Sequence, residues 1–309
     1  MNQSNITFEE AMALSKLPDE SLLKRANDLR NKTKQNKVFT CGIINAKSGF
    51  CSQDCAFCAQ STHHATDVQT YPLFETQKII EKALAFADSG ATHFSIVTSG
   101  FRLNSQEMAT VCRAVDAIKH NTHLILCTSL GTLSLEMAHQ LKQCGVTNYH
   151  HNLETSRSFF DNICTTHDYD DDIETLHIAK AAGLRVCCGG IMGLGESWKQ
   201  RIELAFLLKE LKVEAIPINF LNPIPGTKLE KQPLLSPLTA LKCIALYRLI
   251  SPEADIVVCG GREVTLQEHQ RRLFFAGANG LMIGNYLTTP GQKIDADLSM
   301  IKELGLHIQ

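Results

Sequence analysis

Several features that would place this chain outside the globular enzymes are missing from its sequence. No uncharged apolar run of about 18 residues occurs, which excludes a transmembrane helix. The first ten residues are polar and no apolar signal-peptide segment follows them, so we expect a cytoplasmic protein. Charge of one sign is not in excess, because 30 Lys+Arg stand against 32 Asp+Glu, a net charge of −2. This balance predicts neither a nucleic-acid nor a membrane partner.

Cysteine, in contrast, is abundant. Thiols stay reduced in the cytoplasm, so an excess of cysteine there indicates metal, Fe–S or redox chemistry. For each cysteine taken alone, the alternative is a small buried hydrophobic residue. The 309 residues contain twelve, at positions 41, 51, 55, 58, 112, 127, 144, 164, 187, 188, 243 and 259.

Short apolar runs alternate with segments of helical spacing along most of the chain. The unit repeats roughly every 30 residues, which is the size of a βα repeat with parallel strands. We therefore predict an α/β fold, a TIM-type (β/α)8 barrel, as one domain with residues 1–37 as an N-terminal helical extension and 38–309 as the barrel. An open doubly wound sheet is the alternative, but no Gly-rich dinucleotide turn follows the first strand. The predicted strands are 38–45, 92–99, 123–130, 148–153, 185–192, 215–221, 255–260 and 280–284. The predicted helices are 8–34, 75–88, 105–119, 133–144, 170–182, 198–211, 237–250, 266–275 and 297–304.

Three cysteines follow the first predicted strand at the spacing C-x3-C-x2-C: Cys51, Cys55 and Cys58. Three thiolates in one loop hold three irons of a [4Fe–4S] cluster and leave the fourth iron open. A structural zinc ion fits less well, because it requires a fourth protein ligand nearby.

This motif, with the aromatic Phe57 before its last cysteine, resembles the signature of the radical S-adenosylmethionine (SAM) superfamily. The resemblance implies that Cys51, Cys55 and Cys58 bind a [4Fe–4S] cluster whose open iron chelates SAM. Reductive cleavage of SAM would then supply a 5′-deoxyadenosyl radical. The position also agrees with the fold, since active sites of such barrels lie on the loops after the strands.

Within that superfamily the sequence resembles the biotin synthases over nearly its whole length. The matching segments are 151–156, 189–196, 217–227, 276–279 and 286–289. The resemblance implies radical sulfur insertion that converts dethiobiotin to biotin. It also implies a flavodoxin or ferredoxin as electron donor, Fe–S assembly machinery as a partner, and a homodimer.

The same resemblance assigns roles to five polar residues. Asn152, Glu154 and His167 are expected to contact SAM, and Asn152, Asn219 and Lys47 to contact the substrate. Carboxylate and amide groups at strand ends pair well with diol and ureido groups. The plainer alternatives are a solvated acid for Glu154 and a solvated lysine for Lys47. His167 stands where the family has an arginine, and it precedes an acidic run that suits the start of a helix.

A second set of cysteines lies on alternate predicted strands: Cys41, Cys127, Cys187 and Cys259. Because the four side chains of a barrel layer come from alternate strands, these thiols are predicted to converge inside the barrel on an Fe–S cluster. Four small buried hydrophobic residues are the alternative. Cys188 should point the opposite way from Cys187, towards the helices.

The family resemblance implies an auxiliary cluster as the sulfur donor, usually a [2Fe–2S] cluster on three cysteines and an arginine. Cys127 and Cys187 match that set, but Ser95 and Val257 stand where a cysteine and the arginine are expected. We therefore favour a [4Fe–4S]-like auxiliary cluster. Cys164, in a loop, has no obvious partner.

Other functions remain open on the sequence. A radical SAM enzyme of the hydrogenase-maturase or pyrrolysine-pathway type would share the barrel and the cysteine triplet. A non-catalytic Fe–S protein would bind iron without cleaving SAM, and a structural zinc protein would be colourless.

Overall fold

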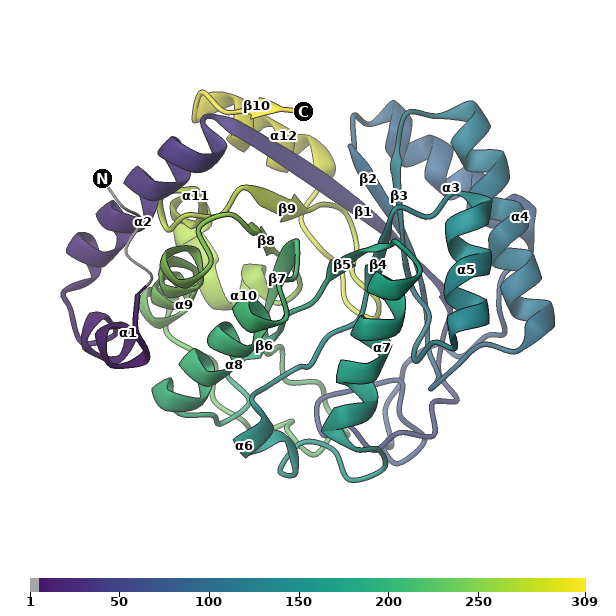
Figure 1. The fold of residues 1–309 in the computed structure, drawn as a ribbon, viewed down its shortest axis with the longest axis horizontal. Coiled ribbons are helices and arrows are strands. Elements are labelled where there is room, and N and C mark those ends of the chain that lie inside the picture. The colour runs from purple at the N-terminus through teal and green to yellow at the C-terminus, as the bar shows by residue number, and fades with distance from the viewer. Residues whose placement is uncertain (1–5) are drawn as a thin grey trace.

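The computed structural model describes residues 6–309, which form a closed barrel of parallel strands surrounded by helices (Figure 1). Every neighbouring pair of barrel strands is parallel, and pairing of the last strand with the first closes the ring. The predicted TIM-type barrel is therefore confirmed. Its strands are β1 (Lys37–Lys47), β2 (His93–Thr98), β3 (Ile125–Ser129), β4 (Asn148–His150), β5 (Arg185–Cys187), β6 (Gly190–Met192), β7 (Ala215–Phe220), β8 (Asp255–Val258) and β9 (Gly280–Met282).

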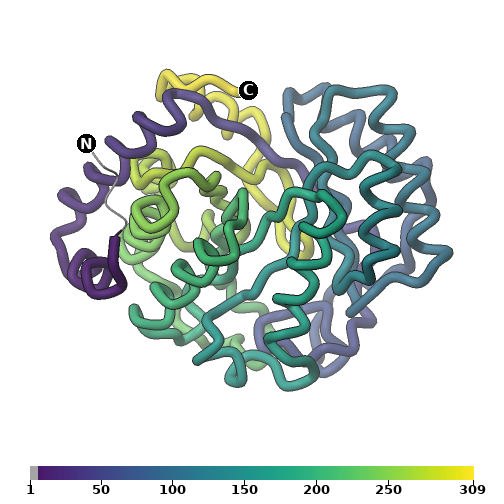
Figure 2. Tube along the Cα trace, viewed as in Figure 1, coloured from purple at the N-terminus to yellow at the C-terminus, as the bar shows by residue number. Residues whose placement is uncertain are grey.

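Helices connect consecutive strands and form the outer layer, as the tube in Figure 2 traces from purple to yellow. At several helix starts the side chain of the N-cap residue accepts a hydrogen bond from a free backbone N–H of the first turn, for example at Asn104, Ser134 and Ser197. The barrel helices are α3 (Thr76–Asp88), α4 (Ser105–Asn121), α5 (Leu135–Cys144), α6 (Arg157–Phe160), α7 (Tyr169–Ala181), α8 (Trp198–Glu210), α9 (Pro237–Ile250), α10 (Arg262–Leu266), α11 (Arg272–Phe275) and α12 (Ile294–Glu303).

The predicted N-terminal extension is two helices, α1 (Phe8–Leu14) and α2 (Asp19–Lys34). Residues 1–5 of that extension lie outside the described part of the chain. Helix α2 packs along α9, and the short strand β10 (His307–Ile308) pairs with the start of β1. In Figure 1 the N-terminal helix α1 lies at the left of the barrel and the C-terminal strand β10 at its top.

Three predicted elements differ from the structure. The predicted helix 8–34 is divided into α1 and α2, and Pro18 precedes the second. The fifth predicted strand, 185–192, is broken into β5 and β6, which both pair with β7. The predicted helix 266–275 is wrong as a continuous helix. It is replaced by α10, a 3-10 turn (Gln267–His269) and α11, because the backbone at Gln267 adopts a positive φ of 49° that interrupts the helix.

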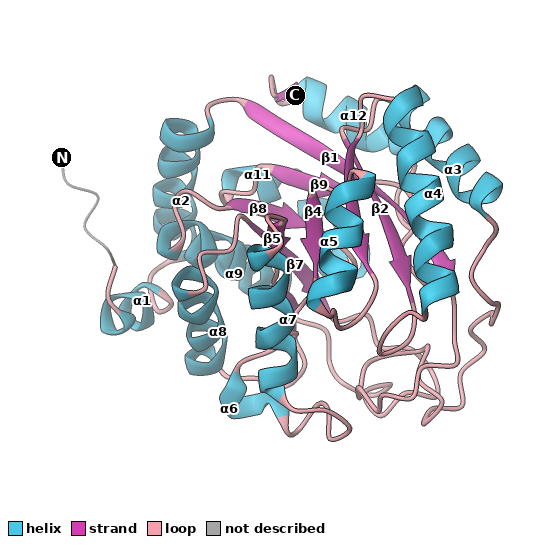
Figure 3. Cartoon of the chain, turned by 45° about the vertical axis from the view of Figure 1, so that its right-hand side comes forward, coloured by secondary structure: helices cyan, strands magenta, loops and turns pink. Residues whose placement is uncertain are grey.

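The strands point towards the end of the barrel where the long loops gather, seen at the bottom of Figure 3. The loop after β1, which carries the cysteine triplet, is among them. No helix within residues 6–309 combines the length and apolar character that crossing a membrane requires.

Candidate active site inside the barrel

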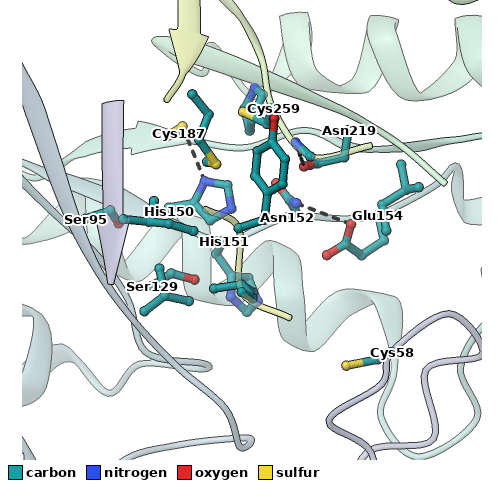
Figure 4. A pocket seen from close by; sticks show the side chains of 18 of the residues that line it. Cys58, Ser95, Ser129, His150, His151, Asn152, Glu154, Cys187, Asn219 and Cys259 are labelled. Carbon is teal, nitrogen blue, oxygen red and sulfur yellow. Dashed lines mark hydrogen bonds between the residues drawn. The ribbon is translucent and has the colours of Figure 1, made fainter. Parts of the chain in front are cut away.

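One cavity of about 470 Å³ runs from the loops at the mouth into the barrel interior. Both cysteine sets line it: Cys51, Cys55, Cys58, Cys41, Cys127, Cys187 and Cys259. Asn152, Glu154, His167 and Asn219 line it as well (Figure 4). A barrel interior of this kind is usually filled by side chains. Here it is hollow, and all the predicted site residues except Lys47 line one chamber.

The triplet loop is held in place by its own backbone. Cys51 N–H donates to the Gln60 carbonyl at 3.1 Å, and Cys58 N–H donates to the Cys55 carbonyl at 2.9 Å. His64 Nδ1 contacts the Cys58 carbonyl at 2.8 Å. Asp54 fastens the loop to the segment after α6, since its carboxylate accepts from both the N–H and the hydroxyl of Thr165 at 2.8 and 2.7 Å. The thiols are therefore presented from a preformed loop.

Cys164, for which the sequence suggested no partner, contacts this loop. Its Sγ lies 3.9 Å from Cys55 Sγ and 3.2 Å from His167 Nδ1. His167 also contacts Gln53 Oε1 at 2.8 Å through Nδ1, and Asp172 Oδ2 at 3.3 Å through Nε2. Burial opposes a charge on His167, but the bonds to Asp172 and Cys164 raise its pKa to about 10. His167 is thus at the cysteine loop, with both ring nitrogens engaged.

Asn152 and Glu154 follow β4 and face the same space. Asn152 Nδ2 donates to Glu154 Oε2 at 3.2 Å, and Asn152 Oδ1 accepts the Gly189 N–H at 3.1 Å. Desolvation in the cavity raises the pKa of Glu154 to about 8, although the bond from Asn152 opposes the shift. Glu154 has a positive φ of 61°, a strained conformation for a residue with a side chain.

The two further residues predicted to contact substrate lie in different surroundings. Asn219, on β7, points into the cavity, and its Oδ1 accepts the Gly260 N–H at 3.0 Å. Its amide nitrogen is therefore directed away from that bond. Lys47, at the end of β1, pairs with Glu107 at 2.7 Å. Lys47 is not among the residues that line the cavity, so the structure does not bring it together with Asn152 and Asn219.

Three of the four barrel cysteines share one layer of side chains. The strands of this barrel are staggered, so residues that share a rung of the hydrogen-bonded ladder do not lie at the same depth. On the second strand along, from β1 to β3 for example, the residue at the same depth lies two positions beyond the residue on the same rung. Cys127 lies on the ladder rung of Ile43, two residues beyond Cys41. Cys187 lies two residues beyond Arg185, which shares its rung with Cys127. Cys41, Cys127 and Cys187 are therefore at one depth.

Cys259 lies one layer nearer the mouth. Through Ala215 of β7, Cys187 shares a rung with Asp255 of β8. The residue at the same depth lies two positions further along β8, so the fourth member of the cysteine layer is Val257. Cys259 is two residues further along, a displacement of about 5 Å along the barrel axis. The prediction of a single layer is thus correct for three thiols and wrong for Cys259. It failed because the stagger cannot be read from approximate strand boundaries.

The four thiols therefore line one chamber, three at one depth and the fourth one layer nearer the mouth. Burial raises the pKa of Cys41 and Cys187, and the neighbouring thiols of the set raise each further. Burial also raises the pKa of Cys127 to about 11 and of Cys259 to about 12. Four mutually facing thiols suit an iron–sulfur cluster, whose bound irons stabilise the thiolates. In residues 6–309 no three His, Cys, Asp or Glu side chains converge as tightly as a single metal ion requires.

Sequence reasoning missed two polar residues of β4. His150 Nδ1 lies 3.4 Å from Cys187 Sγ, and Asn148 Nδ2 donates to Cys127 Sγ at 3.3 Å (His150 and Cys187 in Figure 4). Burial lowers the pKa of His150 to about 4. Their position either side of the buried Tyr149 on a strand marks both as inward-facing, which was the available signal.

Cys188 behaves as predicted. It is fully buried in the main apolar core, whereas Cys187 lines the cavity. Consecutive residues of a strand point to opposite faces, and that separates the two thiols.

Comparison with known proteins gives matches over nearly the whole chain. Residues 46–208 match the family described as the radical SAM superfamily, and residues 217–307 match the biotin and thiamin synthesis associated domain. The chain is 53% identical over 300 residues to the biotin synthase of Syntrophus aciditrophicus, covering 96% of this chain and 92% of that protein. It is 51% identical over 310 residues to the biotin synthase of Nitratidesulfovibrio vulgaris (Hildenborough strain), covering 99% and 86% respectively.

Solved structures show the same fold at much lower identity. Methylornithine synthase superposes with a TM-score of 0.86 at 17% identity, covering 99% of this chain and 94% of that one. HydG, a maturase of the [FeFe]-hydrogenase, superposes with a TM-score of 0.84 at 16% identity, covering 100% and 73%. These two likenesses establish the barrel alone. The full-length identity to curated relatives goes further, and it shows that this chain is a member of the biotin synthase family of radical SAM enzymes.

Proposed function

We propose that this chain converts dethiobiotin to biotin by radical sulfur insertion. The observation that carries the proposal is that one chamber inside the barrel is lined by two separate cysteine sets and by the amides of Asn152 and Asn219. A chamber of this kind keeps water and competing hydrogen donors away from a reactive radical. Its two ends provide separate places for radical generation and for sulfur supply.

At the mouth, Cys51, Cys55 and Cys58 would hold a [4Fe–4S] cluster with one open iron for SAM. When bound, this group supplies the electron that cleaves SAM to the 5′-deoxyadenosyl radical. Glu154 and Asn152 would hold the ribose, since a carboxylate and an amide pair with a diol. His167 would contact the SAM carboxylate, which requires it to give up its contact with Gln53.

Deeper in the barrel, Asn152 and Asn219 would bind the ureido ring of dethiobiotin. Asn219 has its amide oxygen engaged by Gly260 and its amide nitrogen available for the ureido oxygen. Lys47 was expected at the carboxylate end of the substrate. For that role it would have to leave Glu107, so we place it last among the contacts.

The sulfur donor would be an auxiliary Fe–S cluster held by Cys41, Cys127, Cys187 and Cys259. Four thiols that line one chamber provide one ligand for each iron of a [4Fe–4S]-like cluster, which we favour over a [2Fe–2S] cluster. Ser95 and Val257, which lie in neighbouring layers of the same wall, provide neither the thiol nor the arginine that the [2Fe–2S] site requires. A flavodoxin or ferredoxin would deliver electrons, Fe–S assembly machinery would load the clusters, and the protein would act as a homodimer.

The test compares two adjacent cysteines on opposite faces of one strand. Anaerobically reconstituted wild type should bind about eight irons per chain, four for each cluster. Cys187→Ala should retain about four irons, still release deoxyadenosine from SAM and form no biotin. Cys188→Ala, the matched control, should keep all the iron and form biotin, because it loses only packing.

Cys55→Ala tests the mouth separately and should abolish deoxyadenosine formation. Equal iron and biotin in Cys187→Ala and wild type would refute the auxiliary site. Deoxyadenosine formation without any biotin in the wild type would point to a related radical SAM reaction, and iron binding without deoxyadenosine to a non-catalytic Fe–S protein.

A further inference from the structure

Strand β4 lies between the two strands that carry Cys127 and Cys187, and it presents a nitrogen to each thiol. β4 pairs with β3 on one side and β5 on the other. Asn148 shares a rung with Cys127, and His150 shares a rung with Cys187. By the same stagger, Asn148 lies half a layer below the cysteine layer and His150 half a layer above it. The two side chains therefore approach the thiol layer from opposite sides.

Both contacts are short enough for N–H···S hydrogen bonds. Asn148 Nδ2 is 3.3 Å from Cys127 Sγ, and His150 Nδ1 is 3.4 Å from Cys187 Sγ. The amide can only donate to sulfur, and the imidazole donates in the tautomer that is protonated at Nδ1. The remaining two thiols differ. Within the described residues, the hydrogen bonds of Cys41 and Cys259 run to backbone carbonyls at 3.7 and 3.8 Å.

This asymmetry matters for charge. A site of four buried thiolates concentrates negative charge in a poorly solvated chamber, where unpaired charge is costly. An N–H donor to a ligand sulfur withdraws electron density from it, so it stabilises the reduced cluster and raises the reduction potential. Among residues 6–309, side-chain N–H groups reach only the two thiols that face β4, whereas Cys259 is favoured as a thiolate by the charge of Arg262.

We propose that Asn148 and His150 are positioning residues of the auxiliary site, which donate hydrogen bonds to the sulfurs of Cys127 and Cys187 and hold its reduction potential up. The inference rests on the auxiliary site of the proposed function. In this proposal β4 does not bind SAM or substrate. Its two side chains instead adjust the reduction potential of the auxiliary cluster.

The test uses amide side chains of two lengths. In His150→Asn, the amide nitrogen takes nearly the place of Nδ1 and keeps the bond to Cys187. In His150→Gln, the amide takes the place of Nε2 and loses that bond, and His150→Leu has no donor at all. Each reconstituted holoenzyme is titrated anaerobically and followed by EPR and Mössbauer spectroscopy. The cluster at the mouth serves as an internal reference in the same molecule.

The auxiliary potential should stay near the wild-type value in His150→Asn and move to more negative values in His150→Gln and His150→Leu. Asn148→Leu should shift it in the same direction. The potential of the SAM-binding cluster should not move in any of them. Equal auxiliary potentials in all three His150 variants would overturn the proposal, as would equal shifts of both clusters or spectra showing nitrogen bound directly to iron.

If His150→Leu loses the auxiliary cluster, the iron content of the other two variants tests the proposal. Auxiliary iron retained in His150→Asn but not in His150→Gln would support it, and iron retained in both or in neither would overturn it. A wild type with about four irons would instead overturn the auxiliary site itself, and this inference with it.

Discussion

At the scale of single residues, Glu154 is the side chain whose chemistry depends most on where the barrel places it. Desolvation in the cavity raises its pKa to about 8, with Asn152 its hydrogen-bond donor at 3.2 Å. Around neutral pH the free enzyme therefore carries mostly the protonated acid. Hydroxyl donors of a ribose favour the carboxylate, so binding must remove that proton.

The affinity for SAM should consequently rise with pH up to about 8 and then level off. Below the pKa, each pH unit should change the affinity by up to about tenfold, since ionising the acid costs about 1.4 kcal/mol per unit. Equilibrium dialysis of SAM with the cluster-loaded protein at pH 6.5 to 9 measures it. Glu154→Gln is the control, because the pH dependence of its SAM affinity comes from the ionisation of SAM itself. If that pH dependence is identical to wild type, the role of Glu154 is contradicted.

Residue types in the site were more predictable than their contacts. The cysteine triplet is recognisable from its local spacing, and Asn152 and Glu154 from the resemblance of segment 151–156 to the biotin synthases. His150 is not, because its meaning depends on Cys187, a residue 37 positions later in the chain that pairing of β4 with β5 brings alongside it. Contacts between strands are set by register, which sequence patterns leave open.

At the scale of elements, the break between β5 and β6 shows where a sequence pattern stops being informative. Residues 185–192 look like one apolar strand. In the structure the N–H of Gly189 donates to the Asn152 side chain at 3.1 Å instead of to a backbone carbonyl, so the regular ladder is interrupted there. A side chain from the loop after β4 thus takes the place of a ladder bond next to the end of β5.

Gly189 should also resist substitution. A Cβ there would lie 1.9 Å from the backbone carbonyl oxygen of Pro217, so Gly189→Ala must push β7 away. We expect a loss of about 3 kcal/mol in the free energy of unfolding, at the upper end of the range for overpacking. Gly90→Ala is the control: its Cβ would meet no atom within 4 Å, and only its positive φ of 83° costs about 1 kcal/mol. Urea unfolding of the apoprotein compares them, and equal losses would contradict the clash.

At the scale of the whole molecule, the last helix is fastened to the barrel by a buried ion pair. Asp297 of α12 accepts from Arg262 at 2.6 Å, and both side chains are fully buried. Arg262 begins α10, directly after the strand that carries Cys259. The pair therefore connects the C-terminal segment to the loop end of the chamber.

Asp297→Asn should lower the free energy of unfolding by about 3 kcal/mol, the lower end of the range for breaking a buried ion pair, because it removes the nearer of the two carboxylates beside the buried guanidinium and leaves Glu263 at 3.4 Å. Glu303→Gln removes an acid from the same helix. Glu303 pairs with Arg271 at 2.6 Å, but both side chains of this pair are about half exposed. That loss should stay below about 1 kcal/mol. Chemical unfolding of both apoproteins provides the comparison, and a mild effect at Asp297 would show that the segment is held mainly by apolar packing.

The barrel as a whole was predictable because a repeat of roughly 30 residues leaves few alternatives for parallel strands. The repeat does not indicate how neighbouring strands are staggered, and this stagger fixes the depth of each side chain in the barrel. That is why Cys41, Cys127 and Cys187 were correctly grouped while Cys259 was placed one layer too deep.

The layered wall also has a consequence for how such enzymes evolve. The ligand set implied by the usual family pattern and the set proposed for this chain share the positions of Cys127 and Cys187. The other two ligands move by a single step: from the position of Ser95 to Cys41 on the neighbouring strand, and from Val257 to Cys259 along the same strand. Every one of these positions already points into the chamber. With the ligands proposed here, the exchange of one kind of inorganic sulfur store for another would therefore need only a few substitutions at positions that already line the chamber.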